Sequence, residues 1–82
     1  MIGEFDFLKR KKDYKVVFES PEGKRVLKDL MAFCHYRDST FVPNDVGMSA
    51  FNEGKRRVLL RVISLMNIPE ERLNEILHEQ QN

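Results

Sequence analysis

The stretch from Ala50 to Met66, AFNEGKRRVLLRVISLM, constrains the fold of this chain more than any other part of the sequence. Because an α-helix turns by about 100° per residue, the stretch separates into an apolar half and a basic, polar half. The apolar half comprises Phe51, Lys55, Val58, Leu59, Val62, Ile63, Leu65 and Met66, and the other half comprises Glu53, Arg56, Arg57, Arg61 and Ser64. This pattern predicts an amphipathic helix that contributes one face to a core and leaves the other basic.

The length of 82 residues predicts one helical domain over residues 1–82, with frayed ends at 1–4 and 79–82. A chain this short buries only about 60% of its unfolded surface, so its core is thin and a partner or a second copy would add stability. Apolar content of 41% and charged content of 33% are typical of a globular protein rather than a disordered one. The net charge of +1 gives no overall attraction to nucleic acid or membranes. No apolar run is long enough to cross a bilayer.

Phe5 to Phe18 is predicted to be a helix, although Tyr14 to Phe18 taken alone would also suit a strand. A strand needs a partner, and no other strand-like run occurs in the chain. The basic run Lys9 to Lys12 is interpreted as a solvated helix face, with contact to nucleic acid as the alternative.

A second helix is predicted from Ser20 to Tyr36. Ser20 suits the N-cap, Pro21 the first helical position and Glu22 the positive end of the helix dipole. Apolar residues then recur at helical spacing, namely Val26, Leu27, Leu30, Phe33 and Cys34. This position on the apolar face makes Cys34 a core residue rather than a nucleophile.

Arg37 to Gly47 is predicted to be a long loop, because it contains the turn sequence Pro43-Asn44-Asp45 and ends in a glycine. A loop of this length in a small domain usually packs on its own side chains or has a function. Its apolar residues Phe41 and Val42 are therefore either a lid over the open end of the core or a contact for a partner.

The ends of the remaining helices also carry signals. Ser49 is expected to cap the central helix, with Asn44 or Asp45 capping the approach to it. Asn67 tolerates the left-handed conformation that ends a helix, and Pro69 suits the start of another. The last helix has a narrow apolar stripe of Leu73, Ile76 and Leu77, which predicts a surface helix packed across the others.

Two glycines, Gly23 and Gly54, are predicted to mark close helix packing. A glycine inside a helix costs about 1 kcal/mol relative to alanine, so its presence suggests that another element approaches closely. On this interpretation Gly54→Ala overpacks the contact and costs about 1–3 kcal/mol. If Gly54 faced solvent instead, the alanine variant would be the more stable protein.

Leu60 is the one leucine that projects into the basic half of the central helix. Its neighbours there are Arg56, Arg57 and Arg61. Leucine and arginine on an otherwise polar face suit a protein interface, and the four residues are predicted to form one.

No catalytic, metal-binding or cofactor-binding set is visible. Cys34 and His35 are neighbours, but adjacent residues point about 100° apart on a helix, and the only other histidine is His78. A single cysteine excludes an internal disulfide. We therefore expect no metal, no cofactor and no enzyme activity.

Two helical stretches, VFESPEGKRVLKDL at 17–30 and FNEGKRRVLLRV at 51–62, are joined through the loop STFVPND at 39–45. In this combination the chain resembles a family of small tailed-phage proteins typified by a member from a Bordetella podophage. The resemblance covers residues 17–66 and leaves out the N-terminal segment and the last helix. It implies a product that serves particle assembly, DNA packaging or the virion itself, and it carries over no catalytic residue.

The expected fold is all-α, with three to four short helices packed around an antiparallel pair, Ser20–Tyr36 and Ser49–Asn67, and one long loop. The expected function is that of a non-enzymatic phage structural or assembly protein, acting near the head and portal through contacts with other phage proteins or with itself. The alternative is a nucleic-acid-binding accessory that uses the basic faces of the first and third helices. No membrane contact is expected, and the resemblance implies the host cytoplasm during assembly or the virion.

Overall fold

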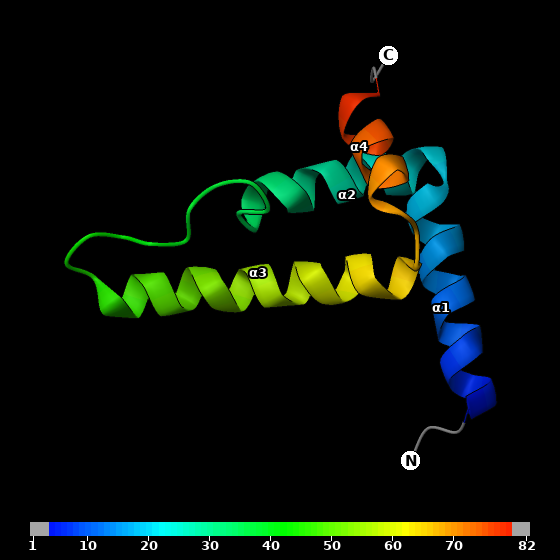
Figure 1. Ribbon diagram of the computed structural model, residues 1–82, viewed down its shortest axis with the longest axis horizontal. Helices are drawn as coiled ribbons and strands as arrows, with labels where there is room; N and C mark the ends of the chain where they lie inside the picture. Colours follow the sequence, from blue (N-terminus) through cyan, green and yellow to red (C-terminus); the bar gives the residue numbers. More distant parts are fainter. Residues whose placement is uncertain (1–3, 80–82) are drawn as a thin grey trace.

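The computed structural model describes residues 4–79, which form four α-helices and no strand. Their bounds are α1 (Glu4–Glu19), α2 (Pro21–Phe33), α3 (Val46–Met66) and α4 (Glu70–His78). Figure 1 shows α2 and α3 running alongside each other in opposite directions, with α1 lying across the C-terminal end of α3. The predicted all-α class and the antiparallel pair are confirmed. Of the predicted frayed ends, residues 1–3 and 80–82 lie outside the described residues, whereas Glu4 begins α1 and Glu79 pairs with Lys24.

The junction between α1 and α2 depends on Ser20. Its hydroxyl donates to the carbonyl oxygen of Val17 at 2.7 Å and accepts from the amide of Gly23 at 2.9 Å. The first bond satisfies a carbonyl at the end of α1, and the second is the predicted N-cap of α2. With Pro21 at the first helical position, one residue is enough to change the direction of the chain sharply.

Gly23 lies buried against the end of α1, as predicted. A Cβ atom at this position would overlap the carbonyl oxygen of Val17 and would lie 2.8 Å from the Cα atom of Phe18. Because these are backbone atoms, they have no flexible end that could move aside. The close approach of α1 to α2 therefore requires glycine here.

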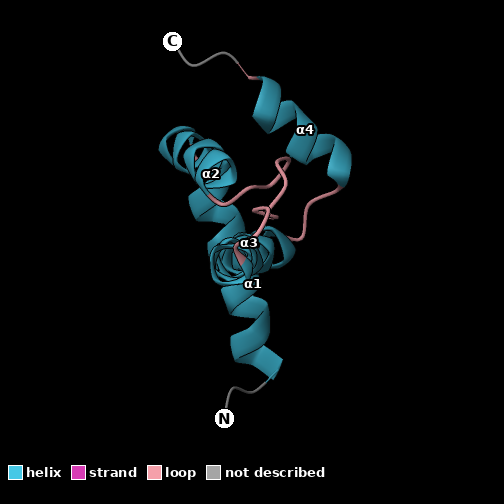
Figure 2. Cartoon of the chain, turned by 90° about the vertical axis from the view of Figure 1, so that its left-hand side faces the viewer, coloured by secondary structure: helices cyan, strands magenta, loops and turns pink. Residues whose placement is uncertain are grey.

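The core lies between α2, α3 and α4. It comprises Leu27 and Met31 from α2, Cys34 at the C-cap of α2, Leu59 and Met66 from α3, and Leu73 and Ile76 from α4. Cys34 is a free, buried thiol, in agreement with the core position predicted for it. Figure 2 shows α4 on one side of the α2–α3 pair. From there its buried residues Leu73 and Ile76 complete this core.

Four residues predicted to face the core are more than half exposed. They are Val26 and Phe33 on α2, and Phe51 and Val58 on α3. Helical periodicity identifies an apolar half of each helix, but the neighbouring elements decide how much of that half is covered. Because α4 covers only one side of the pair, the apolar residues toward the other side remain open to solvent.

α3 begins at Val46, three residues before the predicted start at Ser49. The loop that connects α2 to α3 forms hydrogen bonds with the first turns of α3. Asp45 is the N-cap of α3 and accepts from the amide of Met48 at 2.8 Å. Ser49, predicted as the cap, lies inside the helix, where its hydroxyl accepts from the amide of Val42 at 2.7 Å. Asn52 is buried and donates to the carbonyl oxygen of Thr40.

The lid interpretation of this loop is wrong for Phe41, whose side chain is 68% exposed. Val42 is half-buried, and it lies against the first turns of α3 rather than over the core. Polar bonds to α3, and not apolar burial, hold the loop. Its role as a contact for a partner stays a prediction.

The close packing predicted at Gly54 is absent. A Cβ atom built there meets nothing within 4 Å, and the residue is exposed. A glycine inside a helix does not by itself require a crossing helix, and here it lies on an open side of α3. The expectation that alanine would overpack this position is therefore also wrong.

The last helix is held by ion pairs as well as by the core. Arg72 contacts Glu19 of α1 at 2.7 Å, and Lys24 of α2 contacts Glu79 at 2.9 Å. Lys28 also donates to the carbonyl oxygen of Glu79 at 3.0 Å. The hydrogen bond from Lys24 lowers the pKa of the Glu79 carboxyl, and the hydrogen bond to Glu19 raises the pKa of Arg72. These contacts keep α4 on the predicted path across the other helices.

The described chain is flat and open. It measures 44 × 41 × 19 Å with a radius of gyration of 14.5 Å, against about 12 Å for a compact chain of this length. The N-terminal halves of α1 and α3 project from the core (Figure 1). None of the four helices combines the length and apolar character needed to span a bilayer.

Candidate interaction groove

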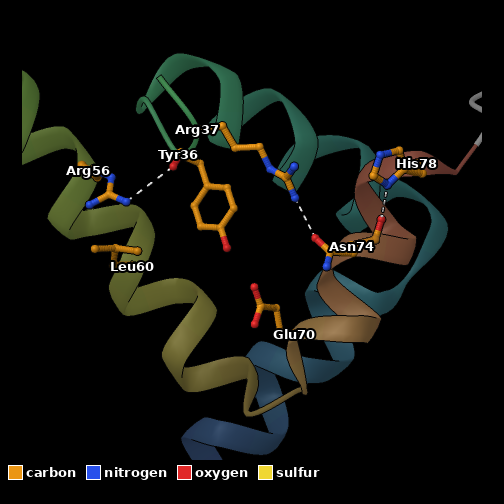
Figure 3. A pocket seen from close by; sticks show the side chains of 7 residues that line it. All are labelled: Tyr36, Arg37, Arg56, Leu60, Glu70, Asn74 and His78. Atoms are coloured by element: carbon orange, nitrogen blue, oxygen red, sulfur yellow. Dashed lines mark hydrogen bonds between the residues drawn. The ribbon is translucent and has the colours of Figure 1, made fainter. Parts of the chain in front are cut away.

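A solvent-open cleft of about 760 Å³ lies between α3, α4 and the end of α2. Figure 3 shows the seven residues that line it, namely Tyr36, Arg37, Arg56, Leu60, Glu70, Asn74 and His78. Most of its polar groups bond to each other. Arg37 donates to the side-chain oxygen of Asn74 at 2.6 Å, and the Nδ1 atom of His78 lies 2.8 Å from the Asn74 carbonyl oxygen. Such bonds stabilise the position of α4.

Arg56 has a structural role in this cleft. Its guanidinium donates to the carbonyl oxygens of His35 at 3.2 Å and Tyr36 at 3.5 Å. These carbonyls directly follow α2, where a cation offsets the negative end of the helix dipole. Arg56 was predicted to belong to the interface, but its guanidinium links α3 to the end of α2.

The other three predicted interface residues line a second hollow, of about 490 Å³, which we name the basic groove. Its lining residues are Phe7 and Lys11 from α1, and Arg57, Leu60, Arg61, Ser64 and Leu65 from α3. Leu60 lines both hollows and therefore stands between them. The structure thus brings Lys11, from the basic run of α1, to the basic face of α3, which lies about fifty residues away in the sequence.

The basic groove combines cationic and apolar side chains. Arg57 and Arg61 are exposed and have no ion-pair or hydrogen-bond partner within residues 4–79. The Lys11 ammonium lies 5.0 Å from the centre of the Phe7 ring. Leu60 is 37% exposed, which leaves part of its side chain open for contact. None of the described residues that line the groove is acidic, so it suits a ligand that carries negative charge next to an apolar group.

The remaining predicted sites stand apart from this groove. Phe41 and Val42 lie beside the start of α3, and Gly23 lies at the α1–α2 junction. Among residues 4–79, no three His, Cys, Asp or Glu side chains come together as a set that could hold a metal ion. Phe7 was missed as a groove residue, since its distance from Leu60 in the sequence hides their proximity.

Comparison with known families identifies the family of this chain. The family model described as Bbp19-like phage protein matches residues 14–77. The chain belongs to this family. The resemblance predicted from residues 17–66 is therefore confirmed. No curated protein and no solved structure matches the chain.

The match to the Bbp19-like family extends further than the predicted resemblance. It takes in the C-terminal part of α1 and all but the last residue of α4. The last helix is thus part of the family unit, as its contribution to the core requires. The half of α1 that carries Phe7 and Lys11 lies before the matched residues, so the basic groove is built partly from a segment outside the family match.

Proposed function

We propose that this Bbp19-like protein is a non-enzymatic phage structural or assembly protein that acts through protein–protein contacts in the head, portal or packaging region. Its partners are other phage proteins or further copies of itself. Its place of action is the host cytoplasm during assembly, and mass spectrometry of purified particles decides whether it stays in the virion.

The observation that supports this proposal is the basic groove around Leu60. Arginine and large apolar side chains are the residues that contribute most to protein interfaces, especially where they lie together in a hollow. Arg57 and Arg61 are free to pair with a partner, because they make no contact of this kind within the described chain. Membership of a phage family makes other phage proteins the natural partners.

Leu60→Asp is expected to weaken the contact with the partner about tenfold or more, while changing the stability of the isolated protein by about 1 kcal/mol at most. The carboxylate removes the apolar contact, but the side chain lies at the groove surface and not in the core. The test is complementation of a phage that lacks the gene, with plaque yield and particle composition as the readouts. Thermal unfolding of the purified variant checks the stability.

Val46→Asp is the matched control, because Val46 is 86% exposed and lies outside the groove. It should support a normal plaque yield. Normal yield from Leu60→Asp as well would show that the groove is not the contact. A loss of several kcal/mol in the isolated Leu60→Asp protein would instead place Leu60 in the core.

Binding to nucleic acid is the second candidate function, and one observation favours it. Lys11, Arg57 and Arg61 line one groove, which would let a phosphate backbone meet all three cations. If the protein acts through protein contacts, we expect it to bind a DNA duplex only weakly at about 150 mM salt, because its net charge is only +1.

Fluorescence anisotropy with a labelled DNA duplex separates the two functions. Affinity that falls with salt at a log–log slope of about −0.9 per phosphate neutralised indicates backbone contact. Sub-micromolar binding at about 150 mM salt, lost in the Arg57→Ala, Arg61→Ala double variant, would favour the nucleic-acid function. Arg25→Ala is the control for a simple loss of charge, since Arg25 is an exposed residue of α2 outside the groove.

A further inference from the structure

A second surface, separate from the basic groove, carries a band of exposed apolar residues. We name it the apolar band. It comprises Val17 on α1, Val26 and Phe33 on α2, and Phe51 and Val58 on α3. Each of these side chains is more than half exposed, with exposed fractions from 51% to 66%. Single exposed apolar residues are ordinary, but several on adjoining helices indicate a contact surface.

Contacts around Lys55 show that the band is continuous across α2 and α3. The Lys55 ammonium lies 4.3 Å from the centre of the Phe33 ring and 5.3 Å from that of Phe51. Val58 lies about one helical turn after Lys55, on the same side of α3. At the other end of the band, Val17 and the α3 residue Val62 line one shallow hollow of about 320 Å³.

Charges on the two helices of the band are complementary. Asp29 lies within roughly 60° of Val26 and Phe33 around α2, at about 100° per residue, so it borders the apolar stripe of that helix. Lys55 lies between the apolar residues of α3. The α2 side of the band is therefore apolar and acidic, whereas the α3 side is apolar and basic.

We propose that the apolar band is the contact between two copies of this chain, with α2 of each copy lying on α3 of the other. In a two-fold contact, each pair of contacting residues occurs twice, once from each copy. If the two-fold axis runs parallel to α2 and α3, Lys55 of one copy lies opposite Phe33 of the second copy. Asp29 of the second copy lies one helical turn, about 6 Å, from that Phe33. This distance is within reach of a lysine side chain, so the dimer gains two equivalent Lys55–Asp29 pairs.

The available area fits a dimer of moderate affinity. With about 150–250 Å² for a phenylalanine side chain, the exposed parts of the five residues amount to on the order of 500 Å² per copy. The total of about 1,000 Å² is at the lower end for a specific interface, and it suits a dissociation constant in the micromolar range. Dimer formation would also cover the side of the α2–α3 pair that α4 leaves open.

Sedimentation velocity from about 1 to 200 µM tests the proposal, and the wild-type protein is expected to change from monomer to dimer over this range. Val58→Asp should weaken dimerisation about tenfold or more, because it places a carboxylate inside the band. Leu8→Asp is the matched control, since Leu8 is 59% exposed on α1 and lies outside the band. A wild-type protein that stays monomeric at 200 µM, or a Val58→Asp variant that dimerises normally, would overturn the inference.

Charge exchange tests the arrangement of the two copies without relying on Val58. Asp29→Lys and Lys55→Glu should each weaken the dimer, and the double variant should recover it, because the exchanged charges again pair across the contact. Failure of the double variant to recover would overturn the placement of α2 on α3.

Leu60→Asp should leave the dimer intact, since Leu60 belongs to the basic groove. Loss of the dimer in Leu60→Asp alone would move the contact to that groove and overturn the band. The phage complementation test of the basic groove remains valid if the purified protein proves to be a monomer, so the two proposals fail separately.

Discussion

Gly23→Ala is expected to destabilise the protein by about 3 kcal/mol or more, or to prevent folding. The added Cβ atom would overlap the Val17 carbonyl oxygen and would lie 2.7 Å from the Val17 carbonyl carbon. Because these are backbone atoms at the end of α1, relief requires the whole helix to move away from α2. Such a movement would also disturb the Ser20 cap, which bonds to both helices.

Urea denaturation of the purified variants measures this effect, and Gly54→Ala is the matched control. The same substitution at the open Gly54 position should stabilise the protein by up to about 1 kcal/mol, through the better helix propensity of alanine. A Gly23→Ala variant with an unchanged midpoint would show that the α1–α2 junction is looser than described. A lower midpoint for Gly54→Ala would show that an element packs against it.

Ile76→Ala is expected to cost about 2–5 kcal/mol, a large part of the roughly 5–10 kcal/mol available to a small domain. Ile76 is fully buried, and it is one of the two α4 residues in the core. A helix of nine residues is not stable alone, so α4 depends on this burial. The substitution should therefore release α4 and expose the side of α2 and α3 that it covers.

Thermal unfolding followed by circular dichroism gives the measurement, with a loss of about 4–8 °C in melting temperature per kcal/mol. Leu8→Ala is the control, because it removes a side chain of equal size from a site that is 59% exposed. It should change stability by about 0.5 kcal/mol at most. If both variants lost the same amount, the ion pairs of Arg72 and Glu79 would be the main support of α4, and not its apolar contacts.

Two helix ends were predicted correctly, because short-range chemistry decides them, whereas α2 ends at Phe33 and not at the predicted Tyr36. Ser20 caps α2 as predicted, and Asn67 ends α3 in the left-handed conformation with φ of 54°. The start of α3 was harder to predict, since Asp45 and Ser49 are both residue types that favour the N-cap position. The choice depends on the loop, where the Ser49 hydroxyl bonds to Val42 and leaves the cap to Asp45.

The candidate site was predictable only in part. The basic face with Leu60 follows from periodicity, and the structure keeps Arg57, Leu60 and Arg61 together in one groove. Arg56 has the same charge and nearly the same place in the pattern, yet it bonds to the end of α2. No local signal separates it from Arg57, because the difference arises from where another helix ends.

The sequence by itself determined the four helices, the cap of α2, the residue that ends α3, the glycine at the α1–α2 junction and the membership of the Bbp19-like phage family. These depend on interactions within a few residues, or on a pattern of residues along the chain. Tertiary structure alone decided which apolar residues are covered, that Gly54 is open, and that Lys11 meets Arg57 in a groove. The physical reason is that periodicity specifies the direction of a side chain around its helix axis, whereas burial depends on which other helix lies in that direction.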